Sequence, residues 1–539
     1  MRRLSSLAIL LASALSLGFQ DALAQGEDAL PLRRGTLRIN LLPDWARWNE
    51  RFGRGTPGRS DGSREPLAVD FSSDSLGVAQ IPSLAATQQR LAFVTGLSGF
   101  ALSLGRARLT LNNNVRVIPI GFDLALSNRL VLHASLPIVR ARVETYLLGP
   151  DTTAATRGNV GLNPALATPA AYDAYLQQVD TLLRALTQQA QTGPAALRAQ
   201  ATAELQSIQP LLCDLYILAA GNPLGNACTS PGAQAWASPL LPIDTSAAGD
   251  SLLAHLGAAR ASYESLRAQY AAQGVAMPAF DAAYALPDQA LDSTGLRNTI
   301  LSFGGDSLTG IVRTRIGNVE LGGWYQLAMG SRWRSQVAFA VRLPTATEDS
   351  PHYFADLGTG TAAMGYEIAF RNDFVLRRDF WVHAGIRASG WTPYDLVRRI
   401  APSTVLLVPI GDTATVRRSP GQTLVIDLVP NWQLDDAFRL GMGVHWVRVG
   451  GTTHEYVTAT DAARIGLAAS VLDQETEMTA LRLGAGLTFS TLERYARGNA
   501  SLPYTVTASY NRVFSGSGGR VPATSAFSLL IRGYIALWR

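Results

Sequence analysis

A period-two alternation of apolar and polar residues in much of this chain limits the folds open to it. Between residues 438 and 446 every even-numbered position is large and apolar, while the odd-numbered positions hold Arg, Gly, Gly and His. The stretches 333–343, 364–371, 481–489 and 527–537 repeat this pattern. Successive side chains of a strand point to opposite faces, so each stretch has one apolar and one polar face. The pattern indicates a β protein, although a soluble sandwich would share it.

The lengths of the connections separate a membrane barrel from a sandwich. We expect twelve strands near residues 36–48, 106–127, 130–148, 317–329, 332–346, 360–376, 379–393, 420–432, 436–450, 476–490, 503–514 and 525–538. Their connections are alternately long and short along the chain. Short turns on one side and long loops on the other are typical of outer-membrane barrels. The sequence therefore predicts an all-β fold, a transmembrane antiparallel β-barrel of about 12 strands with both termini on the periplasmic side.

Composition supports a membrane location without membrane helices. Only 16% of the residues are charged, and the mean hydropathy is +0.10. No apolar run of about 18 residues follows the first twenty positions, which excludes helical spans. All 46 basic residues are arginine, and they form no patch with interleaved aromatic residues, so no nucleic-acid partner is expected. The expected partners are membrane lipid and small-molecule solutes, and the oligomeric state is left open.

The N-terminus has the features of a secretory signal. Arg2 and Arg3 precede a short apolar stretch, and Ala22-Leu23-Ala24 is an A-x-A cleavage site. A signal peptide over 1–24 and outer-membrane localisation are therefore expected. The remaining chain is divided into first barrel strands with a loop (25–148), a helical extracellular insert (149–316) and the remaining barrel strands (317–539).

The insert is rich in Ala, Gln and Leu, and apolar residues recur there at spacings of three and four. This rhythm predicts three amphipathic helices, near 172–186, 197–215 and 252–270. Gly193-Pro194 suits a break between the first two helices, and Asp250 or Ser251 suits the N-cap of the third. Cys213 and Cys228 are the two cysteines of this exported chain, a pattern that favours a disulfide over unpaired thiols.

If the apolar face of each strand meets lipid, the other face forms the lumen. The charged and histidine residues of that face are Asp123, Glu320, Arg334, Arg342, Glu367, Arg371, His383, Arg387, Asp427, Arg439, His445, Arg482 and Arg532. They include seven arginines and four carboxylates. One interpretation is a structural network of cross-strand ion pairs. The other is an electropositive constriction that selects anionic or polarisable solutes.

The sequence holds little that resembles catalytic chemistry. It contains no Walker loop, zincin helix or Cys-x-x-Cys, so we expect neither a cofactor nor a metal, and no enzyme. His133-Ala134-Ser135 is similar to the His-x-Ser pair of the outer-membrane phospholipase A family, in which histidine acts as base and serine as nucleophile. No partner asparagine is identified, so a lipid hydrolase remains a minor alternative.

A broader resemblance covers residues 315–539. Arg342-Leu343-Pro344-Thr345, Asp349-Ser350-Pro351 and Asp356-Leu357-Gly358-Thr359-Gly360 resemble the loop pattern of barrels of the phenol meta-pathway transporter type. The segment from Gly317 to Gly322 is similar to a Gly-Asp-Val/Leu segment of that group, and Ala346 departs from its usual glycine. The resemblance implies an outer-membrane channel that passes small hydrophobic or aromatic molecules by passive diffusion. The alternative from another class is a barrel-anchored surface protein whose insert binds a partner.

Overall fold

The computed structural model describes residues 31–53, 62–149, 157–220, 238–303, 308–401, 408–519 and 521–538. The predicted signal peptide (1–24) and Cys228 lie outside these residues. These residues divide into two compact units, one drawn from the described parts of 31–70, 109–146 and 308–538, and the other from those of 71–108 and 147–303. The first is a barrel and the second is helical.

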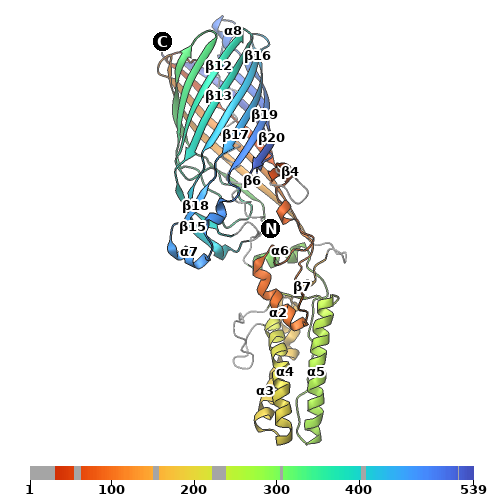
Figure 1. The fold of residues 1–539 in the computed structure, drawn as a ribbon. Coiled ribbons are helices and arrows are strands. Elements are labelled where there is room, and N and C mark those ends of the chain that lie inside the picture. Colours follow the sequence, from red (N-terminus) through yellow and green to blue (C-terminus); the bar gives the residue numbers. More distant parts are fainter. Residues whose placement is uncertain are drawn as a thin grey trace. The chain divides into compact units, whose positions relative to one another are not determined.

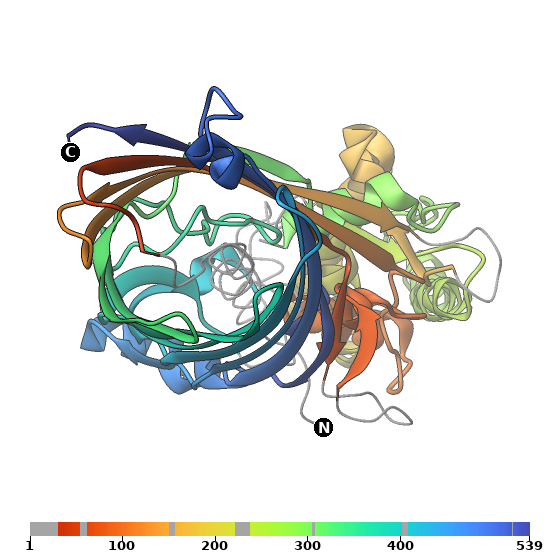
Figure 2. The ribbon, with the colours of Figure 1, turned by 90° about the horizontal axis from the view of Figure 1, so that it is seen from above.

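The barrel is one closed antiparallel sheet (Figures 1 and 2). In chain order its strands are β1 (Thr36–Leu41), β2 (Asp44–Trp48), β5 (Arg108–Ala125), β6 (Leu130–Leu148), β9 (Ile311–Ile316), β10 (Glu320–Met329), β11 (Trp333–Arg342), β12 (Gly365–Arg377), β13 (Phe380–Trp391), β16 (Thr423–Gln433), β17 (Phe438–Val449), β19 (Met478–Ser490), β20 (Tyr504–Gly518) and β22 (Ser525–Ala536). β1 and β2 both pair with β5 and β22, and β9 and β10 both pair with β6. Within the described residues these 14 strands therefore fill twelve positions, which confirms the predicted count.

The interruption between β1 and β2 has a local cause. Pro43 separates β1 from β2, and proline has no N–H to donate to the ladder. Closure joins the first and last strands, with Thr36 opposite Ala536. The described ends of the chain thus lie at the short-turn end of the barrel, as the even strand number predicts.

The two faces of the sheet differ as the alternation predicts. Large apolar side chains are exposed on the outside, for example Phe339 (57%), Ile368 (58%) and Met442 (51%). Their neighbours along the strands, such as Ala340, Ala369 and Gly441, are buried on the other face. An exposed apolar band of this extent is typical of a surface that meets lipid.

Smaller elements lie at the long-loop ends of the strands. They are β3 (Glu50–Gly53), β4 (Ser63–Pro66), β14 (Tyr394–Arg399), β15 (Thr413–Ser419), β18 (Thr453–Tyr456), β21 (Val521–Pro522), α7 (Ala459–Ile465), η2 (Val69–Phe71), η6 (Ile410–Asp412) and η7 (Ala469–Asp473), while α8 (Leu492–Ala496) lies in a short-side connection. β14, β15 and β18 form a sheet whose core includes Leu396, Val416 and Leu472. The loops after β13 and β17 therefore pack into one structured body.

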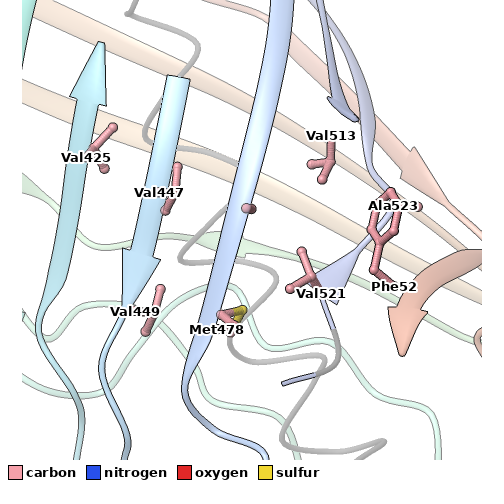
Figure 3. Close-up of a cluster of buried hydrophobic side chains, with 9 residues drawn as sticks. Phe52, Val425, Val447, Val449, Met478, Val513, Val521 and Ala523 are labelled. Carbon is pink, nitrogen blue, oxygen red and sulfur yellow. The ribbon is translucent and has the colours of Figure 1, made fainter. Parts of the chain in front are cut away.

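An apolar cluster lies where the long loops meet the barrel (Figure 3). Val425, Val447 and Met478 come from the neighbouring strands β16, β17 and β19, and Phe52 and Val521 from the sheet β21-β3-β4. Val447 shares the parity of His445, so this patch continues the inner face. On β16, β17 and β19 the inner face is thus apolar near the long loops and charged further along the strands, at Asp427, His445 and Arg482.

The helical unit has its own core. Its elements are η3 (Pro82–Leu84), α2 (Ala85–Thr95), β7 (Val160–Leu162), η4 (Pro164–Leu166), η5 (Pro169–Tyr172), α3 (Asp173–Thr192), α4 (Ala195–Ala220), β8 (Leu240–Pro242), α5 (Ala247–Ala272) and α6 (Ser293–Ser302). Tyr175, Leu183, Leu212, Leu256 and Tyr263 are among its fully or almost fully buried side chains. None of the helices in the described residues has the length and hydropathy of a membrane span.

The three predicted helices of the insert are present as α3, α4 and α5, but the predicted range 149–316 is too long at its end, because β9 (Ile311–Ile316) pairs with β6 in the barrel. α3 and α4 meet at Gly193-Pro194 as expected. The predicted cap is wrong: Ser246, not Asp250 or Ser251, is the N-cap of α5 and accepts from the Gly249 N–H. The unit also includes residues 71–108, which the sequence analysis left in a loop and a strand end. Cys213 is buried in α4, and its predicted disulfide with Cys228 stays a prediction.

Candidate functional site

Polar side chains of β1, β5 and β6 meet around one buried carboxylate. Asp123 is fully buried, and its Oδ2 accepts from Arg38 Nε at 2.7 Å and from Asn40 Nδ2 at 2.5 Å. Nδ1 of His133 lies 2.6 Å from Oδ1 of the same carboxylate. The guanidinium of Arg38 also stacks on Trp324, 5.3 Å from the ring centroid. Three strands are thus joined through Asp123 at the inner face.

The network continues across β10, β11 and β12. Nε2 of His133 lies 3.6 Å from Glu320 Oε1. Arg342 then donates from Nε to Glu320 Oε2 at 2.8 Å, and from its NH2 group to Glu367 Oε2 at 2.5 Å. The Arg342 side chain is only 5% exposed. A buried arginine is tolerated here because two carboxylates receive it.

The loop after β11, residues 343–364, is tied to the junction of β9 and β10. Asn318 Nδ2 donates to the backbone oxygens of Leu343 (2.8 Å) and Thr361 (2.7 Å), and its Oδ1 accepts from the Thr361 N–H. Thr345 Oγ1 donates to the Gly317 oxygen at 2.6 Å. These residues belong to the motifs on which the family resemblance rests. Their shared role in this structure is to hold the loop at the inner face.

Network and loop together enclose a cavity of about 160 Å³. Its lining residues come from both: Arg38, Asn40, Leu42, Val117, Pro119, Gly121, Asp123, His133, Ser135, Pro137, Val139, Gly317, Asn318, Glu320, Arg342, Thr359, Gly360, Thr361, Glu367, Arg371, Arg387, Trp391 and Arg532. Gly360 is required by space, because an added Cβ would collide with the Asn318 side chain. The cavity is therefore the place where the loop motifs and the charged inner face come together.

A second polar region lies on β12, β13, β16 and β17. Two aspartate–histidine pairs form there across neighbouring strands: His383 Nδ1 lies 2.8 Å from Asp373 Oδ1, and His445 Nδ1 lies 2.7 Å from Asp427 Oδ1. Arg387 approaches Asp427 to 3.9 Å. His445 also lines a smaller cavity together with Asp44, Arg482 and Ser528.

The predicted site residues thus occur in two groups. Asp123, Glu320, Arg342, Glu367, Arg371, Arg387 and Arg532 line the larger cavity, and His445 and Arg482 the smaller one. His383 and Arg439 are buried, whereas Arg334 is half-buried opposite Asp373 in the strand register. Asp427 belongs to the aspartate–histidine region. Their role as a solute path stays a prediction.

Several inner-face residues were missed by the sequence analysis. Arg38 and Asn40 alternate with Leu37, Ile39 and Leu41, so the parity signal was present in the first strand. Asp373 has the parity of Glu367 and Arg371 and is completely buried. The carboxylates Asp44 and Asp373 were not in the predicted set, so the excess of arginines over carboxylates on the inner face is smaller than the sequence indicates.

Aromatic residues near strand ends are typical of the interface girdles of membrane barrels, but two tryptophans near strand ends lie on the inner face instead. Trp391 lines the larger cavity and lies under the Arg342 guanidinium at 5.9 Å. Trp381 lies under the Arg439 guanidinium at 5.5 Å. Both have the parity of His383 and Arg387, the inner one. Position near a strand end was a weaker guide than parity.

The hydrolase fragment has a more elaborate setting than its sequence indicates. His133 and Ser135 both line the larger cavity, and Asp123 holds Nδ1 of the histidine. However, Nε2 of His133 points to Glu320, which is also the register partner of Ser135. A base for Ser135 would need that nitrogen free. Among the described residues, no group of three or more His, Cys, Asp or Glu is arranged to hold a metal ion.

No protein-family model matches the chain, and no curated protein matches it either. Among solved structures, an outer-membrane channel from Pseudomonas putida F1 is similar over 95% of this chain and 99% of its own, at 8% identity and a TM-score of 0.42. The CymD monoaromatic hydrocarbon channel is similar over 97% of this chain and 92% of its own, at 11% identity and a TM-score of 0.30. The toluene transporter TbuX of Ralstonia pickettii is similar over 95% of this chain and 92% of its own, at 8% identity and a TM-score of 0.28.

Proposed function

We propose that this chain is an outer-membrane channel that passes small hydrophobic or aromatic molecules by passive diffusion. The observation that carries the proposal is the closed barrel with an exposed apolar outer band and a polar inner face that encloses a cavity. Closure leaves no unpaired strand edge toward lipid, which is what a membrane requires. A charged, hollow interior distinguishes a channel from a barrel that serves only as an anchor.

Size and lining support a small cargo. An apolar protein cavity of about 150 Å³ holds benzene, and the larger cavity here measures about 160 Å³. Leu42, Val117 and Val139 provide apolar contacts on one side, and the apolar cluster of Figure 3 provides a hydrophobic surface nearer the long loops. A solute moves from the apolar patch to the charged region along the inner face.

Single-channel recording in planar bilayers tests the proposal. The purified chain produces discrete conductance steps, and the reversal potential across a salt gradient shows a preference for anions. Replacing Arg387 and Arg439 by Gln reduces that preference. A preparation that folds, as judged by heat-modifiable migration on a gel, but never conducts contradicts the channel.

We further propose that the helical unit lies on the extracellular side. It interrupts two long connections, those that precede β5 and follow β6, and the long loops of such barrels are extracellular. Its separate core favours one alternative function, a barrel-anchored surface protein whose helices bind a partner. The bilayer recording also separates these two, because an anchor does not conduct.

The buried Asp123–His133 pair beside Ser135 favours a second alternative, a lipid hydrolase. We expect no enzymatic activity, because the Glu320 carboxylate, 3.6 Å from Nε2 of His133, competes with Ser135 for the nitrogen that would activate the serine. The purified protein therefore releases no fatty acid from phospholipid vesicles. Turnover in the parent protein that disappears in Ser135→Ala would establish the hydrolase.

A further inference from the structure

The larger cavity has two unlike walls. Leu42, Val117, Pro119, Pro137 and Val139 come from the β1–β2 junction, β5 and β6, and all are apolar. The other wall is formed by β11, β12 and β13, which β10 separates from β6 in the sheet. β1, β5 and β6 also contribute Arg38, Asp123 and His133, so the apolar wall is a patch on these strands. A ligand that fills the cavity therefore contacts this apolar patch as well as charged groups.

The charged wall is dominated by arginine. Glu367 lies in the electrostatic field of three of them, Arg342, Arg387 and Arg371. Trp391 lines the cavity from the end of β13, and Arg342 lies over its ring. An indole ring and several guanidinium groups thus line the same cavity.

The charge of the lining is not balanced. Five of the lining residues are arginine, namely Arg38, Arg342, Arg371, Arg387 and Arg532, whereas only Asp123, Glu320 and Glu367 are carboxylates. With His133 neutral, the lining has two more positive than negative charges, or one more when Asp427, 3.9 Å from Arg387, is included. An additional anion in the cavity would compensate part of this excess.

We propose that the cavity selects small aromatic carboxylates over neutral aromatic molecules. The ring packs against the apolar wall and Trp391, and the carboxylate accepts hydrogen bonds from Arg371 and Arg387. This inference rests on the proposed channel function and names its preferred cargo. Arginine suits the task because its planar fork binds a carboxylate through two parallel hydrogen bonds.

A neutral ring of the same size matches this cavity less well. It fills the apolar side of the cavity. However, it displaces water from the guanidinium groups and supplies no hydrogen-bond acceptor in its place. A carboxylate without a ring has the opposite defect, since it leaves the apolar wall in contact with water. Only a molecule with both parts satisfies both walls.

Three probes separate these contributions. Benzoate has the ring and the charge, benzamide keeps the shape without the charge, and acetate keeps the charge without the ring. Each is added to the bilayer chamber during chloride conduction, and the concentration that halves the current is measured. We expect this concentration to be at least tenfold lower for benzoate than for benzamide or for acetate.

Variants test the assigned residues. Arg387→Gln raises the half-blocking concentration of benzoate at least tenfold and leaves that of benzamide within twofold. Trp391→Leu weakens block by benzoate and not by acetate. Arg378→Gln removes an exposed arginine from the turn between β12 and β13, and as the matched control it leaves all three values within twofold.

The outcomes distinguish this inference from the channel itself. If the parent protein conducts but benzoate and benzamide block equally, or acetate blocks as well as benzoate, the carboxylate selectivity is wrong and the channel stands. If the folded protein never conducts, the proposed function fails. The comparison of probes uses the unaltered protein, so the inference can be refuted even if a variant does not fold.

Discussion

Replacing Arg342 by Met should destabilise the barrel more than any exposed substitution, because it removes the centre of a buried ion triad. The Arg342 side chain is 5% exposed, Glu367 10% and Glu320 23%. At an effective dielectric constant of about 20, a charge pair about 4 Å apart is worth about 4 kcal/mol before desolvation. Removing one partner of a buried pair typically costs about 3–5 kcal/mol, because the other charge is left uncompensated.

The expected loss lies near the lower end of that range. Glu320 retains contact with solvent, and Arg371 and Arg387 still act on Glu367. We therefore expect Arg342→Met to lower the free energy of unfolding by about 3 kcal/mol. Combining it with Glu320→Gln and Glu367→Gln should restore most of the loss, because the stranded negative charges are then gone.

Equilibrium urea unfolding of the barrel in lipid vesicles, followed by tryptophan fluorescence, measures these differences. Arg378→Met is the matched control, with an expected change within about 0.5 kcal/mol for an exposed position. A loss below about 1 kcal/mol in Arg342→Met, the range of exposed pairs, would refute the reasoning. It would mean that water in the lumen solvates both carboxylates.

The remaining predictions concern the loops and the helical unit. Replacing residues 72–104 and 150–305 by Gly-Ser linkers should leave heat-modifiable migration intact, because β6 pairs directly with β9 and β10; loss of migration would make the helical unit part of the barrel's folding core. Burial, together with Arg418 and Arg398, lowers the pKa of His454 in the loop sheet below its usual 6.5, although Asp473 opposes this. A lowered pKa means that the folded state binds fewer protons, so this stabilisation is present above about pH 6.5 and is lost as the pH falls through the folded pKa. Amide exchange in β18 should therefore accelerate in acid, and His454→Gln should remove most of that acceleration; an unchanged pH profile in His454→Gln would contradict it.

Strand number and facing were predictable because both depend on local pattern. A period of two assigns every residue of a strand once one is assigned, so Arg371 and Arg439 could be placed on the inner face without knowing their neighbours. Side-chain partners such as Asp123 and Arg38, 85 positions apart, were not predictable, because the order of the strands does not fix their register. The spacing of residues along the chain does not determine which residues of two paired strands lie opposite each other.

The structures that the long loops form together could not be predicted from the sequence pattern, for a different reason. α2 has little amphipathic periodicity, and its buried face becomes visible only when α4 and α5 pack on it. Likewise, Arg398 binds Asp349 with both NH groups at 2.8 Å, although 49 residues separate them. Long loops that pack on one another follow tertiary contacts, which local propensity does not encode.

The motifs behind the family resemblance and the residues that would choose a cargo are different sets. Asn318, Thr345 and Gly360 hold the loop to the inner face through backbone hydrogen bonds and close packing, a role that does not depend on what the barrel carries. Arg387 and Trp391 lie outside those motifs and contact the cavity with their side chains. A chain can therefore keep the loop architecture while its lining changes, and resemblance in these motifs is evidence for the tether. Selectivity has to be derived from the lining of each barrel.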